Sequence, residues 1–423
     1  MKTAKTPMMA LTHTPRRSGR PDLSLTAATL ACLSMAACQP LHEGLRGGLL
    51  EPWLSAGASA PDLNPLQSVF EPDGEGDLSE RDARDTDPDE APAGPWSDHT
   101  GRAAEEGANH DAPPRRAEYV LMGVDCFGAE EGACDLFSRL AGLDEGQRLK
   151  LGWTGDGAAG RIQQSGAFAL VNLSPVFYPD GSAYVTIDVV PSLQRERLKL
   201  RPAPDLDVTI NSNLLEIHDK FNAAWMSLFA QGVDVSSTSR AGYWHYSHDT
   251  LVPFVKLFRA EVPGQRQELI QVMLYDAHPE RRQAAASLLG FDREDALSAE
   301  ALTWALLDPA PVVRSAAARA LLPKVRHAVG RHDDTPPISA VPVIHMLSLP
   351  STSDRSGASA LLAELALLPS LRGQILSATF PILLQMIEAT APGSRGSAVE
   401  VLQAATGLSY GAEPERWKQV KIQ

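Results

Sequence analysis

The stretch GYWHYSHD at residues 242–249 holds the densest group of chemically active side chains in the sequence. His245 and His248 stand three residues apart, a spacing that on a helix would place both imidazoles on one face. Asp249 or Asp219 could then add an oxygen ligand, as transition-metal sites require. This pattern defines one hypothesis, a metal or proton-transfer site.

The residues around the two histidines favour a second hypothesis, structural packing. Ser247 or Asp249 precedes the apolar run at 251–254, which is typical of a helix entrance with a capping side chain. Pro253 suits the first turn of that helix. The preceding stretch is then an irregular connector, packed against the junction of two folded units by three aromatic residues: Tyr243, Trp244 and Tyr246. We expect this packing role, with the metal and ligand-contact alternatives still open.

Three common catalytic motifs are missing from the sequence. It contains no GxSxG nucleophile elbow, no phosphate-binding P-loop and no HExxH metal pair. The formal net charge of −14, without a basic stripe to offset it, argues against binding to nucleic acid. The sequence therefore predicts a protein that is not an enzyme, has no cofactor and does not bind nucleic acid.

The N-terminus has the pattern of an export signal. Basic residues between Lys2 and Arg20 precede an apolar stretch at residues 23–37, which ends in small residues. We assign residues 1–37 to a signal peptide. The apolar run is short for a bilayer span, which disfavours an uncleaved transmembrane anchor.

The end of this segment reads LSMAAC at residues 33–38 and resembles the bacterial lipobox, with Met35 where leucine is commonest. The resemblance implies cleavage before Cys38 and lipidation of its thiol. Gln39 is not the aspartate associated with inner-membrane retention, so the outer membrane is the expected address, facing the periplasm or the cell surface. Cleavage near Ala37, giving a secreted protein, is the alternative.

The four cysteines agree with export. Cys32 leaves with the signal peptide and Cys38 carries the lipid, so Cys126 and Cys134 remain as an even pair. In an oxidising compartment we expect them to form a disulfide between the first strand and the first helix of the folded region. Free buried thiols and a metal site are the alternatives.

Residues 38–116 are rich in Pro, Gly, Asp and Glu, as in EPDGEGDLSERDARDTDPDE. Such a composition buries too little apolar area to offset the entropy of ordering. We therefore predict a disordered acidic linker between the lipid and the folded part.

Residues 117–203 are predicted to form a small α/β domain in the order β-α-α-β-β. The last two strands, FALVNLSPVFY and AYVTIDVV, flank a Pro179-Asp180-Gly181 turn and should form a hairpin. The unit resembles a POTRA domain through LDEGQRL at 143–149, GAF at 166–168 and the Val/Ile ladder of its last strand. The resemblance implies a periplasmic domain that binds peptides or proteins.

The C-terminal half contains an internal repeat, after a connector at 204–262 that is predicted to be helical. Asp276 and Arg282, followed by three alanines, recur about 32 residues later as Asp308 and Arg314, also followed by three alanines. Weaker copies contain Arg355 and Arg395. Residues 263–423 resemble HEAT repeats, in which Asp and Arg six positions apart link successive helical hairpins. The resemblance implies an α-solenoid with a polar ladder.

Taken together, the sequence predicts an α+β multidomain envelope lipoprotein that acts as a non-catalytic scaffold for an unknown protein partner. Two alternatives are an enzyme, either a metal-dependent hydrolase at His245 and His248 or a HEAT-type lyase, and an accessory factor for outer-membrane protein assembly. A scaffold needs surface grooves, an enzyme needs converging polar groups, and an assembly factor needs an open sheet edge.

Overall fold

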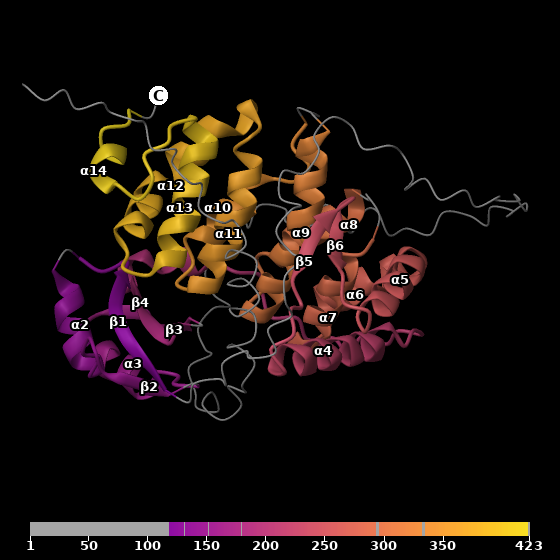
Figure 1. The fold of residues 1–423 in the computed structure, drawn as a ribbon, viewed down its shortest axis with the longest axis horizontal. Coiled ribbons are helices and arrows are strands. Elements are labelled where there is room, and N and C mark those ends of the chain that lie inside the picture. The colour runs from indigo at the N-terminus through magenta and orange to yellow at the C-terminus, as the bar shows by residue number, and fades with distance from the viewer. Residues whose placement is uncertain are drawn as a thin grey trace, which may run out of the picture. The chain divides into compact units, whose positions relative to one another are not determined.

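A four-stranded sheet is followed along the chain by a stack of helices in the computed structural model (Figure 1). This arrangement confirms the predicted α+β class. The predicted signal peptide, Cys38 and the acidic linker lie outside the described residues. The structure describes residues 118–421 apart from residues 131, 151, 179, 293–295 and 332–334.

The sheet has the strand order β2-β1-β4-β3. Its strands are β1 (Glu118–Phe127), β2 (Arg148–Lys150), β3 (Phe168–Phe177) and β4 (Ser182–Pro191). β3 and β4 form the predicted antiparallel hairpin, while β1 lies parallel to β4. The short strand β2 was not predicted, so the observed order is β-α-β-α-β-β. It pairs only with the first residues of β1, and three residues are too few to show a period in the sequence.

Two helices, α2 (Ala133–Ala141) and α3 (Asp156–Gln163), supply side chains to the core on one face of the sheet. The alternation predicted for β4 places one set of residues in this core: Ala183, Val185, Ile187 and Val189. The other set points to the opposite face, where Thr186 and Asp188 are also buried. Because a carboxyl group is stable in such a place only with a partner, this second face must be covered by something polar.

The segment after β4 runs along the loops of the helical stack. It begins as a 3-10 helix, Ser192–Leu198, in which Arg197 donates to the Ser348 carbonyl over 3.0 Å. Further on, the Arg201 amide donates to the Leu307 carbonyl over 2.8 Å, and Leu206 forms a β-bridge with Asp276. One extended segment therefore contacts three successive turns of the stack.

The region predicted as a helical connector contains two strands as well as helices, which corrects that prediction. Its elements are α4 (Leu214–Ala230), β5 (Ser237–Arg240), β6 (Tyr243–Tyr246), α5 (Val252–Glu261) and a 3-10 turn, Val262–Gln265. β5 and β6 pair as an antiparallel hairpin. Ala241 and Gly242 form its turn with φ values of 46° and 82°, the left-handed region that glycine adopts without strain.

The helical stack is built from pairs, as the internal repeat predicts. Its elements are α6 (Arg266–Tyr275), α7 (Pro279–Leu289), α8 (Ala296–Ala305), α9 (Pro311–Gly330), α10 (Ala340–Leu347), α11 (Thr352–Leu365), α12 (Pro369–Glu388), α13 (Pro392–Thr406) and the short α14 (Pro414–Trp417). Helix α9 packs against both α7 and α11, and α11 packs in turn against α13. Ala285 and Ala317, at matching positions of α7 and α9, are fully buried and allow this close approach. No helix in the described part of the chain has both the length and the apolar character of a membrane span.

Candidate functional site

Buried ion pairs connect successive helical pairs. Arg282 of α7 donates to both carboxylate oxygens of Asp308, over 2.9 and 2.8 Å, and to the Asp276 carbonyl over 2.8 Å. Arg314 of α9 repeats the pattern with Asp354, over 3.0 and 2.6 Å, and with the Asp308 carbonyl over 2.7 Å. Two-point pairing of this kind fixes both the distance and the orientation of the partners. We call these pairs the ladder.

The third rung of the ladder leaves the stack and reaches the sheet. Arg355 of α11 donates to both carboxylate oxygens of Asp188 on β4, over 2.6 and 3.1 Å. Its guanidinium also lies 4.0 Å from the centre of the Phe127 ring at the end of β1, a cation–π contact. Burial raises the pKa of the Asp188 carboxyl, and Arg355 opposes that rise. Asp188 thus takes the place that an aspartate of the next repeat holds in the other rungs.

A second carboxylate of the sheet binds the start of α13. Asp125 on β1 accepts hydrogen bonds from the backbone amides of Thr390, over 2.5 Å, and Ala391, over 3.0 Å. These amides precede the first turn of the helix, where unpaired N–H groups and the helix dipole favour an anion. Gly123 permits the close approach, because a Cβ atom there would collide with the Thr390 side chain. We call Asp125, Asp188 and their partners on the stack the docking interface.

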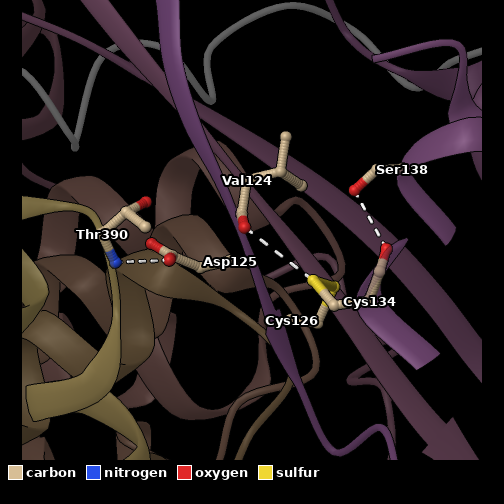
Figure 2. Close-up of a disulfide and its surroundings, with 6 residues drawn as sticks. All are labelled: Val124, Asp125, Cys126, Cys134, Ser138 and Thr390. Carbon is tan, nitrogen blue, oxygen red and sulfur yellow. Dashed lines mark hydrogen bonds between the residues drawn. A yellow bond between two sulfur atoms is a disulfide. The ribbon is translucent and has the colours of Figure 1, made fainter. Parts of the chain in front are cut away.

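A disulfide lies directly beside this interface. Cys126 at the end of β1 is bonded to Cys134 in the first turn of α2, which confirms the predicted pairing (Figure 2). Figure 2 shows Asp125 and Cys126 pointing to opposite sides of the strand. Closing so short a loop stabilises the fold by about 2–3 kcal/mol through the unfolded chain.

The structure places the residues of GYWHYSHD on a strand and the turn after it. His245 lies on β6 opposite Thr238, and the His248 Nδ1 accepts a hydrogen bond from the Thr250 amide over 3.2 Å. Among the residues described, no three His, Cys, Asp or Glu side chains are grouped as metal ligands would be. The expected side-chain cap from Ser247 or Asp249 is also missing, since Leu251 occupies the cap position of α5 and no side chain bonds there.

The three aromatic residues of this stretch pack within the helical part, not at the junction with the sheet as predicted. The Trp244 indole donates to the Arg319 carbonyl of α9 over 2.7 Å. The Tyr243 hydroxyl accepts from Arg259 over 2.9 Å, and the Tyr246 hydroxyl accepts from Arg319 over 3.0 Å. The hairpin is therefore bound to α9 and α5 through the polar edges of its aromatic rings.

His218 of α4 is a buried titratable residue that the sequence analysis missed. It lies among aromatic rings, with Phe221 and Phe258 at centroid distances of 6.4 Å. Its Nδ1 lies 3.3 Å from the Asn222 amide. Burial lowers the pKa of His218 from 6.5 to about 4. The sequence signal was a single histidine four residues from an asparagine on an apolar helix, which carries little information alone.

His218 should make the stability of the protein depend on acidity. A lowered folded-state pKa means that the fold favours the neutral ring. The stability that the neutral His218 ring contributes is therefore complete above pH 6.5 and is lost as the pH falls towards 4. The full effect is roughly 3 kcal/mol. We expect His218→Phe to remove most of this loss in urea unfolding at pH 7.5 and 4.5. His248→Gln is the matched control and should behave as the parent protein; an unaltered pH dependence in His218→Phe would contradict the assignment.

A shallow depression lies beside β2. It is lined by residues 147–150, Gly152 and Trp153. The cationic side chains of Arg148 and Lys150 lie on the solvent side of the strand, and Arg148 pairs with Glu118 over 3.1 Å. The depression brings together no acid, base and nucleophile.

No protein-family model matches the chain, and no curated protein is significantly similar to it.

Proposed function

We propose that this protein is an exported, lipid-anchored envelope protein that acts as a non-catalytic scaffold for protein–protein interaction. The observation that carries the proposal is the ladder, which joins α7, α9 and α11 and then the sheet through buried ion pairs. Such pairs specify how neighbouring units are oriented, and they hold an extended surface in one shape. A fixed extended surface is the property that a scaffold requires.

The two parts of the molecule suit this role in different ways. The stack supports a HEAT-like interpretation because its helical pairs repeat the Asp and Arg positions at Asp276, Arg282, Asp308 and Arg314. The sheet supports a POTRA-like interpretation because two helices pack on one face and the last two strands form a hairpin. Both surfaces would then be displayed together above the membrane.

The lipid anchor has its own test. We expect Cys38→Ser to move the protein from the membrane fraction to the soluble periplasmic fraction, because one thioether-linked lipid is the proposed attachment. Fractionation followed by immunoblotting measures the change, and Cys32→Ser is the matched control that should stay with the membrane. A Cys38→Ser protein that sediments with membranes as the parent does would refute lipidation as the anchor.

The scaffold role is tested by photo-crosslinking in cells. A photoreactive amino acid is placed at Val341 of α10, which is exposed, or at Gln403 of α13, which is half-buried. We expect discrete adducts with the same few proteins from both positions. Adducts from neither position, in a protein that is folded and correctly located, would remove support for the stack as an interaction surface.

An assembly-factor role is the second candidate, and one observation favours it. Strand β3 spans ten residues and lies at the edge of the sheet, with β4 as its only strand partner among the described residues. Such an edge accepts a client strand through backbone hydrogen bonds. The photoreactive residue at Leu170, which is 36% exposed on β3, distinguishes the two roles: adducts with nascent outer-membrane proteins would favour assembly over scaffolding.

A further inference from the structure

The disulfide and the docking interface share the last residues of β1. Cys126 stands between Asp125, which binds the start of α13, and Phe127, which lies under the Arg355 guanidinium. Figure 2 shows the disulfide on one side of the strand and the bond from Asp125 to Thr390 on the other. We propose that the Cys126–Cys134 disulfide is a redox-sensitive lock on the docking of the sheet against the helical stack. This inference goes beyond the scaffold role and does not depend on it.

The end of β1 has little other support on its outer side. Strand β2 pairs with Glu118, Tyr119 and Val120, and the residues just before β2 bond Leu121; among the described residues, those of β1 after Leu121 have a strand partner on the β4 side alone. On the open side, Cys134 Sγ lies 3.8 Å from the Val124 carbonyl oxygen. The disulfide therefore holds the end of β1 on its outer side, as pairing with β2 holds the start of the strand.

Movement of this strand end would disturb several contacts with the stack at once. The Phe127 ring supports Arg355, which holds Asp188. Gly128 lies against the Val189 carbonyl and the Arg197 side chain, leaving no room for a Cβ atom, and Arg197 bonds the Ser348 carbonyl. Three residues at this strand end, Asp125, Phe127 and Gly128, thus support contacts with α13, with α11 and with the loop before α11.

The chemical step is an ordinary thiol–disulfide exchange. A dithiol supplies two electrons and two protons, the Cys126–Cys134 bond breaks to give two thiols, and the dithiol becomes a cyclic disulfide. Both cysteines are partly exposed, so a reductant has access. The loop between them contains Gly128 and Gly132 with φ values of 75° and 80°. Once the bond is broken, these glycines let the loop rearrange and release the strand end.

Release would uncover a receptor for carboxylates on the stack. With the sheet undocked, the Thr390 and Ala391 amides and the Arg355 guanidinium lose Asp125 and Asp188 as partners. These are donors that a carboxylate of another protein could bind. Oxidation would keep the site occupied by the chain's own aspartates, and reduction would open it.

Hydrogen exchange at the two amides tests the lock. The full exported chain is compared before and after treatment with dithiothreitol, and the exchange of the Thr390 and Ala391 amides is followed by mass spectrometry or NMR. We expect exchange to accelerate on the order of tenfold on reduction, because local undocking exposes both amides. The Ala310 amide, which donates before α9 to the carboxylate of Asp308 two residues earlier and does not touch the sheet, is the internal control and should not change.

A second variant excludes effects of the reductant itself. Cys126→Ser with Cys134→Ser, measured without dithiothreitol, should reproduce the faster exchange at Thr390 and Ala391. Unchanged exchange at these amides, in protein whose two thiols are fully alkylated, would overturn the proposal. Equal acceleration at Ala310 would overturn it as well, since it would mean general unfolding and not undocking.

Discussion

Replacing Arg314 by alanine should lower the free energy of unfolding by about 3–5 kcal/mol. The side chains of Arg314 and Asp354 are 5% and 0% exposed, and they are joined by two hydrogen bonds. The variant leaves the Asp354 carboxylate buried without its cation, and it removes the donor to the Asp308 carbonyl. Most of the cost arises from this uncompensated charge and not from the pair itself.

Urea unfolding at neutral pH measures this change, and Arg326→Ala is the matched control. Arg326 lies in the same helix and pairs with Glu364 over 2.6 Å, but its side chain is 42% exposed. An exposed pair contributes less than about 1 kcal/mol, so this variant should unfold nearly as the parent does. If partner binding per folded molecule falls in Arg314→Ala while stability stays unchanged, Arg314 is a binding residue and the structural assignment is wrong.

The sequence could predict those features that depend on local pattern. The β3–β4 hairpin follows from two alternating runs around a turn, in which the Asp180 carboxylate accepts from the Ser182 amide over 2.9 Å. The disulfide follows from an even pair of cysteines in a chain whose N-terminus has the pattern of an export signal. The first rung of the ladder follows from a repeat, because Arg282 and Asp308 stand at the repeated arginine and aspartate positions of successive helical pairs.

Prediction failed where spacing varies or elements are short. Arg282 and Asp308 are 26 residues apart, but Arg314 and Asp354 are 40 apart, mainly because α9 has 20 residues where α7 has 11. A constant offset therefore cannot find Asp354. The sequence predicts only a connector at the hairpin of β5 and β6, because strands of four residues are too short to show a clear period. The signal available was the Ala241-Gly242 turn between a Ser/Thr-rich run and an aromatic run.

The docking interface was beyond sequence reasoning for a different reason. Asp188 and Arg355 are 167 residues apart, and Asp125 and Ala391 are 266 apart. Each aspartate lies in an otherwise apolar strand, where the pattern of the strand predicts an exposed residue on the polar face. Only the packing of a second unit on that face makes it buried, and no periodicity within either segment reports such packing.

Replacing Arg355 by methionine should destabilise the protein by about 3–5 kcal/mol near neutral pH, because Asp188 would remain buried without the cation that forms its ion pair. Adding Asp188→Leu should recover most of the stability, because an apolar pair of similar volume avoids the buried charge. A double variant that is no more stable than Arg355→Met would show that the loss comes from packing and not from the unpaired carboxylate.

The pH dependence of the same variant separates charge from packing more sharply. Burial already raises the pKa of Asp188 with Arg355 present, and without Arg355 the rise is larger. A raised folded-state pKa means that the fold favours the protonated carboxyl, so stability is kept below the ordinary carboxyl pKa of about 4 and lost as the pH rises through the raised value. The deficit of Arg355→Met relative to the parent should therefore be small in urea unfolding at pH 4.5 and large at pH 7.5. A deficit of equal size at both values would mean that Arg355 acts through its contact with Phe127 alone.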